Sequence, residues 1–158
     1  MSEERKKRVV IIASHGTMDM AYPPLIIATG AAAMDMEAAI FFTFYGLQIL
    51  RKGKADKLQV APIANPAMPM PVPNIVGMLP GMTALATSMM NGMFRKSHVA
   101  KLSELLELAQ ESGVRLIACQ MTMDAMGFKK EELIDGLEYG GVATMLEFAS
   151  QDAITFAF

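Results

Sequence analysis

The amino-acid sequence predicts an α/β fold built on a mostly parallel sheet. Two apolar runs, residues 8–14 and residues 38–44, are rich in β-branched and aromatic side chains, as expected for strands buried on both faces. A helix-forming stretch separates them. A strand, a helix and a strand this close together form a βαβ unit, whose right-handed crossover pairs the strands in parallel. The 158 residues suffice for one core, so we expect a single domain over residues 1–158.

The helices and the later strands follow from local signals. Pro23 and Pro24 can open the first helix, whose body of small and apolar residues lies at 25–34. Leucine and alanine recur at helical spacing over residues 98–112, and Gly113 can end that helix. The remaining expected elements are a helix at 82–94, a strand at 114–119, helices at 120–126, 131–137 and 141–149, and a final strand at 153–158.

One long segment carries no charge. From residue 58 to residue 94 there is no Asp, Glu, Lys or Arg, although this segment holds most of the prolines. Residues 62–73 cannot form a helix or a central strand, because each proline lacks an N–H donor and fixes φ. A membrane span is disfavoured, since it needs about 20 uninterrupted apolar residues. We interpret the segment at about 58–94 as a Pro/Met-rich insertion that forms a subunit interface, a lid over a thiol or a membrane-surface contact.

Composition excludes some function classes. The net charge of -2 provides no basic field for a nucleic-acid partner. Charged residues are only 19% of the chain, below the ~25% of an average protein, which favours a homo-oligomer. The first eight residues are mostly charged and the next apolar run is broken at residues 14–16, so no signal-peptide pattern is present. We expect a cytoplasmic protein, with peripheral membrane contact as a further hypothesis.

Cys119 is the single cysteine, and it stands where an apolar strand ends and a short helix begins. A lone thiol cannot close an internal disulfide, so it serves packing, metal ligation or sulfur chemistry. Free N–H groups and the helix dipole at the helix start would lower the pKa of this thiol below the ~8.5 of free cysteine. A buried, unreactive cysteine is the alternative, and the pattern alone ranks the two equally.

Three segments should meet beside this thiol, because the carboxyl ends of parallel strands gather ligands and reactive groups. They are His15-Gly16, Tyr45-Gly46 and Cys119-Gln120. We expect Cys119 and His15 to be catalytic, with His15 as a general base, although a strand-end histidine more often only bonds the backbone. The residues expected to bind substrate are Tyr45, Gly46, Gln120 and Met121.

Metal and cofactor sites are not expected. One cysteine and two histidines, His15 and His98, lack the ligand spacing of a zinc site. The glycines at 77–81 and at 140–141 have neither the spacing nor the strand-to-helix context of a nucleotide-binding loop. The chemistry would therefore have to come from the protein's own side chains.

Five segments share their pattern with a known family: residues 26–34, 41–47, 65–71, 79–83 and 118–127. They resemble the DsrE/DsrF-like sulfur-trafficking proteins, in particular a methionine-rich branch labelled peroxiredoxin-like or DsrE-like. The resemblance implies a three-layer, flavodoxin-like sandwich that oligomerises. It also implies that Cys119, in its Cys-x-Met-x-Met-Asp pattern, accepts sulfane sulfur as a persulfide and exchanges it with a TusA-like or rhodanese-like protein.

The first function hypothesis is thus a sulfur carrier or sulfurtransferase that relays sulfur on Cys119. The alternative is a non-catalytic interaction or scaffold protein that docks through its apolar segment at 68–94. A thiol peroxidase is a third hypothesis, but the chain has no second cysteine to resolve an oxidised one and would need an external thiol.

Overall fold

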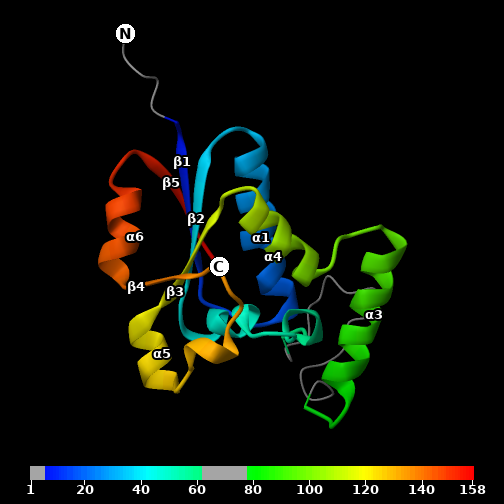
Figure 1. Cartoon of the computed structure of the whole chain (residues 1–158). Helices are drawn as coiled ribbons and strands as arrows, with labels where there is room; N and C mark the ends of the chain where they lie inside the picture. Colours follow the sequence, from blue (N-terminus) through cyan, green and yellow to red (C-terminus); the bar gives the residue numbers. More distant parts are fainter. Residues whose placement is uncertain (1–5, 62–77) are drawn as a thin grey trace.

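The centre of the fold is a five-stranded sheet, seen in a computed structural model that describes residues 6–61 and 78–158. Every paired strand runs parallel to its neighbour, in the order β4-β3-β2-β1-β5 (Figure 1). The strands are β1 Arg8–Ala13, β2 Glu37–Phe42, β3 Arg115–Cys119, β4 Glu138–Gly140 and β5 Ala153–Ala157. The predicted α/β fold with a parallel sheet is confirmed.

Helices cover both faces of this sheet (Figure 1). Helices α1 (Met18–Ala33) and α4 (Leu102–Glu111) pack on one face, and α6 (Val142–Ala149) packs on the other. The chain adds β2, β3 and β4 on one side of β1 and then returns to place β5 on the other side. Because parallel crossovers are right-handed, this reversal moves α6 to the opposite face. The result is the expected three-layer sandwich.

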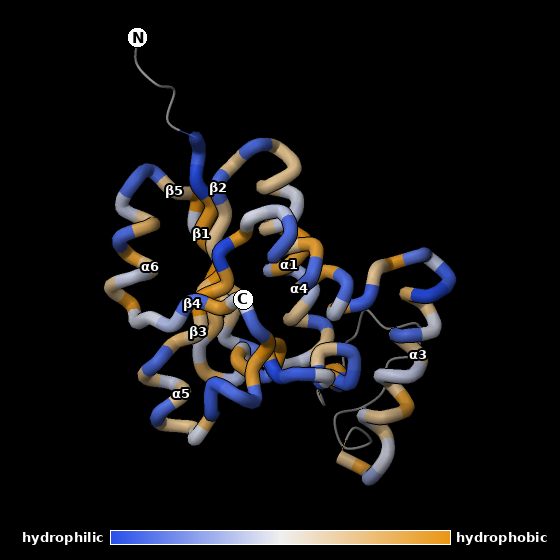
Figure 2. Tube along the Cα trace, viewed as in Figure 1, coloured by the Kyte–Doolittle hydropathy of each residue, from blue (hydrophilic) through white to orange (hydrophobic). Residues whose placement is uncertain are grey.

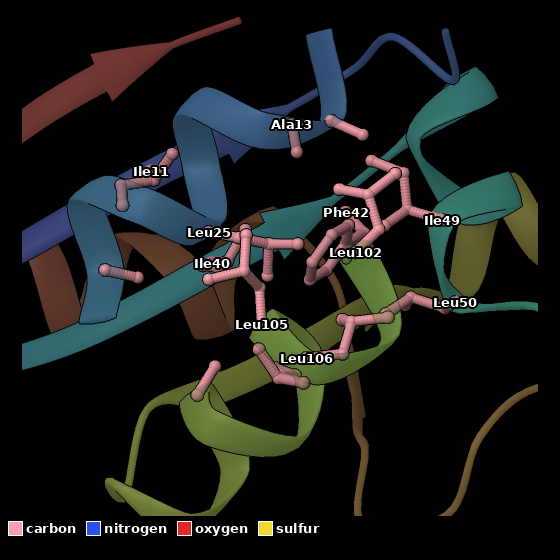
Figure 3. Close-up of a cluster of buried hydrophobic side chains, with 14 of the residues drawn as sticks. Ile11, Ala13, Leu25, Ile40, Phe42, Ile49, Leu50, Leu102, Leu105 and Leu106 are labelled. Carbon is pink, nitrogen blue, oxygen red and sulfur yellow. The ribbon is translucent and has the colours of Figure 1, made fainter. Parts of the chain in front are cut away.

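The main core lies between the sheet and the α1–α4 layer (Figure 3). Figure 2 shows hydrophobic stretches in the central strands and in the α1–α4 region. Side chains alternate along each strand, so every second residue enters this core. The fully buried members with the largest side chains include Ile11, Leu25, Ile40, Phe42, Leu102 and Leu116.

Helix α1 begins earlier than the sequence predicted. It starts at Met18, so Pro23 and Pro24 lie inside the helix rather than opening it. Each proline lacks the N–H that would bond the carbonyl four residues earlier. The start is fixed instead by a hydrogen bond from the Met18 N–H to the Gln59 carbonyl, 2.8 Å long, and by the negative charge of Asp19 in the first turn.

The predicted helix at 131–137 is wrong. A 3-10 turn, η3 (Lys130–Glu132), is followed by an unpredicted strand, β4. Arg115 explains the strand, because its Nε and Nη2 donate to the two carboxylate oxygens of Glu138 at 2.8 and 2.6 Å and so draw this segment to the sheet. Such bidentate pairs are the strongest kind of charge-assisted hydrogen bond.

Two boundaries also differ from the prediction. Helix α4 begins at Leu102 instead of residue 98, because His98 has a positive φ of 54° that no helix accommodates. Strand β2 ends at Phe42, and Phe44, with φ of 46°, opens the 3-10 turn η1 (Phe44–Leu50). A second short turn, η2 (Ala55–Lys57), leads into the charge-free segment.

The charge-free segment is described only in part, because its residues 62–77 lie outside the described ranges. The expectation for the proline-rich stretch at 62–73 falls entirely on those residues. The predicted helix at 82–94 is confirmed as α3 (Met82–Lys96), which stands at the side of the sandwich (Figure 1). Two contacts hold α3 in this position. The rings of Phe94 and Tyr22 pack edge to face, with their centroids 4.9 Å apart. The Thr87 hydroxyl accepts a hydrogen bond from the Val60 N–H at 3.1 Å. No helix among the described residues is long and apolar enough to cross a membrane.

The segments at the ends of β1 and β2 lie so close together that their backbones form direct hydrogen bonds. The Gly46 N–H donates to the Ser14 carbonyl at 3.2 Å, and the Thr43 N–H donates to the Ala13 carbonyl at 3.0 Å. A Cβ atom on Gly46 would collide with the Ala13 carbonyl oxygen, and one on Gly16 would collide with the Tyr45 carbonyl oxygen. Glycine at both positions is therefore required by close packing.

We predict that Gly46→Ala lowers the free energy of unfolding by about 1–3 kcal/mol, because the added methyl group would displace rigid backbone. Urea denaturation followed by circular dichroism measures the change. The matched control is Gly30→Ala in helix α1, where a Cβ meets nothing within 4 Å and alanine should stabilise by ~0.5–1 kcal/mol. Equal effects of the two substitutions would contradict the packing argument.

Candidate functional site: a buried thiol at the carboxyl edge of the sheet

Cys119 is the last residue of β3 and the N-cap of α5 (Gln120–Met126), and Gly127 ends that helix with φ of 72°. This is the strand-to-helix junction that the sequence predicted. Helix α5 lies at the carboxyl edge of the sheet beside η1 (Figure 1). The three segments predicted to meet are thus neighbours: the ends of β1 and β2 touch through Gly16 and Gly46, and α5 bonds the end of β2.

The Cys119 side chain is almost fully buried, with 1% of its surface exposed. It belongs to the smaller core cluster under α6, with apolar side chains from four elements: Val10, Ala39, Phe41, Ile117 and Phe148. Burial among such groups normally favours the neutral thiol. The polar groups on its other side therefore decide whether the sulfur is reactive.

Two buried threonines supply these polar groups. The hydroxyls of Thr43, after β2, and Thr122, in α5, are 3.0 Å apart, and Thr122 Oγ1 also accepts from the Phe44 N–H at 3.3 Å. In the part of the chain that the structure describes, these are the buried polar residues. Buried hydroxyls need partners, since an unpaired one costs about 1–3 kcal/mol. Their pairing links the end of β2 to the helix that follows Cys119.

These groups change the acidity of the thiol. Burial raises the pKa of Cys119, but hydrogen bonding from the hydroxyl and the amide of Thr122, the hydroxyl of Thr43 and the amide of Met121 outweighs it, so the pKa lies below its ordinary value. Met121 and Thr122 are the second and third residues of α5, whose N–H groups have no partner within the helix. A sulfur anion at the N-cap occupies the position where helices favour negative charge.

The other residues singled out in the sequence differ in how deeply they are buried and in what they contact. His15 is exposed, and its Nδ1 is 3.1 Å from the Ser14 hydroxyl. No hydrogen bond joins the His15 ring to Cys119, and His15 is not among the groups that shift the pKa of Cys119, so its role as a base stays a prediction. The Gln120 amide donates to Asp124 at 3.0 Å.

The four residues expected to bind substrate divide into two groups. Tyr45 and Met121 are largely exposed, at 65% and 60%, and can reach a molecule that docks at this edge. Gly46 is buried, and its packing against Ala13 accounts for the glycine without a ligand. Gln120 is half-buried. Among the residues with described positions, no group of three or more His, Cys, Asp or Glu side chains could hold a metal ion.

Sequence reasoning missed Thr43 and Thr122. One signal was present, because Thr43 is the polar residue in the apolar run at 38–44, and Thr122 lies within the motif that follows the cysteine. Their partnership was not visible, since the two residues are 79 positions apart. Phe44 was also missed, and an aromatic residue with positive φ is uncommon enough to mark a functional region.

Comparisons with known proteins identify the family of this chain. The model of the DsrE/DsrF/DrsH-like family matches residues 5–156. The chain is 46% identical over 155 residues to the sulfur carrier protein DsrE2 of Allochromatium vinosum, covering 94% of this chain and 96% of that one. It is 37% identical over 161 residues to the uncharacterised protein YrkE of Bacillus subtilis, covering 96% of each.

Two solved structures share the fold. The ychN protein from E. coli has a TM-score of 0.58 at 14% identity, with 98% of this chain and all of that one covered. MTH1491 from Methanobacterium thermoautotrophicum, described as a protein of unknown function, has a TM-score of 0.56 at 13% identity, with 97% of this chain and all of that one covered. On the evidence of the near-complete match and of both relatives, the chain belongs to the DsrE/DsrF/DrsH-like family.

Proposed function

We propose that this protein is a sulfur carrier that holds sulfane sulfur as a persulfide on Cys119. The observation that carries the proposal is a single buried thiol whose pKa is lowered by the Thr43–Thr122 pair and the start of α5. Support comes also from the relative at 46% identity, which is named a sulfur carrier protein. The family alone would suggest sulfur chemistry, and the site adds a physical reason for it to occur at this residue.

The transfer needs only one cysteine. The Cys119 thiolate attacks the outer sulfur of a donor persulfide, so the donor's S–S bond breaks, a new S–S bond forms on Cys119 and the donor leaves as a thiolate. Nothing is oxidised or reduced overall. In the second step an acceptor thiolate attacks the outer sulfur of the Cys119 persulfide, and Cys119 leaves as a thiolate.

The hydroxyl pair assists both steps. A lower pKa raises the fraction of Cys119 that is present as the attacking thiolate. It also makes Cys119 a better leaving group when the sulfur is passed on, because thiols of low pKa leave faster. A carrier must both accept and release its cargo, and one set of hydrogen-bond donors to the sulfur serves the two directions.

A protein partner is the natural source and destination of this sulfur. Cys119 is buried, but exposed apolar side chains lie at the same edge of the sheet: Phe44, Tyr45 and Met121. We infer that a TusA-like or rhodanese-like protein docks on these side chains and that docking directs its reactive sulfur toward Cys119. Phe44, which has a positive φ, donates its N–H to Thr122, so these exposed side chains lie beside the threonine pair.

The scaffold hypothesis has its own structural support. Leu85, Met89 and Met93 follow one another at spacings of one helical turn on α3 and are exposed. This exposed apolar stripe lies about 100° around the helix from the side that packs on the core through Ala86, Met90 and Phe94. In a scaffold that docks through this stripe, the chemistry of Cys119 would be dispensable.

Persulfide formation is the first test. Incubation with glutathione persulfide, followed by intact-mass measurement without reductant, should add one sulfur atom to the wild-type protein. Dithiothreitol should remove it. Cys119→Ser is the control and should gain nothing, because no other cysteine is present. A wild type that stays unmodified, or a serine variant that gains the same mass, rules out the proposed carrier role.

The threonine pair gives a second prediction. Thr122→Val keeps the shape but removes the hydroxyl, so the pKa of Cys119 should rise and its rate of alkylation by iodoacetamide should reach half-maximum at a higher pH. Thr122→Ser keeps the hydroxyl and serves as the matched control, with a profile close to wild type. Both variants should be checked by circular dichroism. A valine variant with the wild-type pH profile would show that the hydroxyl does not tune the sulfur.

Partner docking gives a third prediction. Tyr45→Asp and Met121→Asp place charge on the exposed side chains, so they should slow sulfur transfer from a rhodanese persulfide at least tenfold, which corresponds to about 1.4 kcal/mol. Transfer from the small donor glutathione persulfide should change little. Met34→Asp, at the exposed C-cap position that follows α1 and lies outside this edge, is the control. Equal loss with both donors would place the effect on the site and not on docking.

A further inference from the structure

A hollow of about 610 Å³ lies between α3 and the body of the sandwich, where α3 stands at the side (Figure 1). Its walls come from α1, η2, α3 and the start of α4, and the residues that line it include Tyr22, Lys57, Asn91, Arg95 and Leu102. Small-molecule sites usually have volumes of roughly 300–1,000 Å³, so this hollow has the size of a binding site. It is separate from Cys119, which belongs to the core cluster under α6 on the other face of the sheet.

Helix α3 turns a polar side toward this hollow. Thr87, Asn91 and Arg95 recur every four residues, so they form one stripe along the helix, and all three line the hollow. The exposed apolar stripe that begins at Leu85 runs two residues ahead of it, which is about 200° around the helix. Surface helices ordinarily do the reverse and turn their apolar side toward the body. A polar wall that faces the body indicates that the hollow accommodates a polar group.

The lining of the hollow has an excess of positive charge. Its charged residues are Lys57, Arg95, Lys101 and Asp56, so three positive charges against one negative charge leave a formal net charge of +2. The Asp56 carboxylate is already engaged, since its oxygens accept from the N–H and the hydroxyl of Ser103 at 2.9 and 2.6 Å. Among the described residues, none of the three cations forms a salt bridge. Their charge is therefore available to a ligand.

A second hollow of similar size shows a lining whose charges are balanced within the protein. It has a volume of about 570 Å³, lies at the amino ends of β1, β2 and β3, and also contains three cations. Each of them has an acidic partner: Lys6 pairs with Asp35, Arg8 with Glu37, and Arg115 with Glu138. The cations beside α3 lack such partners, and the charge-free segment at 58–94 contains no acid that could supply one. This difference points to an anionic ligand in the hollow beside α3.

We propose that the hollow between α3 and the body binds a small phosphate monoester whose organic part is aromatic or apolar. A phosphate monoester carries about −1.5 to −2 charges at pH 7, which matches the charge of the lining better than a carboxylate does. The planar guanidinium of Arg95 can bind two phosphate oxygens at once. The rings of Tyr22 and Phe94 also line the hollow and provide an apolar wall for the rest of the molecule. The proposal does not depend on the chemistry of Cys119.

Binding of 1-naphthyl phosphate to the full chain tests the proposal. Isothermal titration calorimetry should show that this probe binds at least about tenfold more tightly than 1-naphthol, which lacks the phosphate, because hydrogen bonds between charged groups are worth that much. Inorganic phosphate, which lacks the rings, should also bind more weakly than the probe. A wild type that does not bind naphthyl phosphate, or that binds naphthol equally well, overturns the proposal.

Two pairs of variants test where the probe binds. Arg95→Gln should weaken binding roughly tenfold, because it removes a charged hydrogen-bond donor from the hollow. Lys96→Gln is the matched control, since it removes the same charge from the next residue, which does not line the hollow. Asn91→Phe should block binding by filling the hollow, whereas Met89→Phe puts the same ring on the exposed stripe and should leave binding unchanged. Equal effects within either pair would place the probe elsewhere and overturn the proposal.

Discussion

Parallel pairing of β1, β2 and β3 is the constraint on which the rest of the structure depends. Because the three strands run in the same direction, their carboxyl ends lie at one edge, and everything that follows them must be accommodated there. Close packing then requires glycine at positions 16 and 46, where any side chain would strike a carbonyl oxygen. The same geometry brings Thr43, at the end of β2, within hydrogen-bond distance of Thr122 in the helix after β3.

That contact resolves the tension between burial and reactivity at Cys119. A sulfur with 1% exposure among apolar side chains would ordinarily be an inert thiol. Here the burial also strengthens the hydrogen bonds that favour the anion, because water does not compete for them. The donors come from threonine and from the start of a helix, so the site lowers the pKa of the thiol without a charged partner. In the proposed carrier role, such a site would protect the bound sulfur from solvent between two transfers.

Much of this could be predicted from the sequence, and the failures have physical causes. Strands β1 and β3 and the junction at Cys119 were predictable, because local apolar runs and a helix stop encode them. The Thr43–Thr122 pair could not be found, since it depends on a tertiary contact. Pro23 and Pro24 gave the wrong helix start, because the hydrogen bond from Met18 to Gln59 outweighs the preference of proline for the first turn of a helix. Strand β4 was missed because an ion pair, and not an apolar run, holds it in the sheet.

The central claim is that the fold itself makes Cys119 acidic, and titration of its thiolate absorbance in the ultraviolet tests this most directly. As the only cysteine, it can be followed in the native protein and again in the same protein unfolded in urea. The account predicts a lower pKa in the native protein than in the unfolded chain. A native pKa equal to or above the unfolded one would show that burial dominates, and would contradict the account.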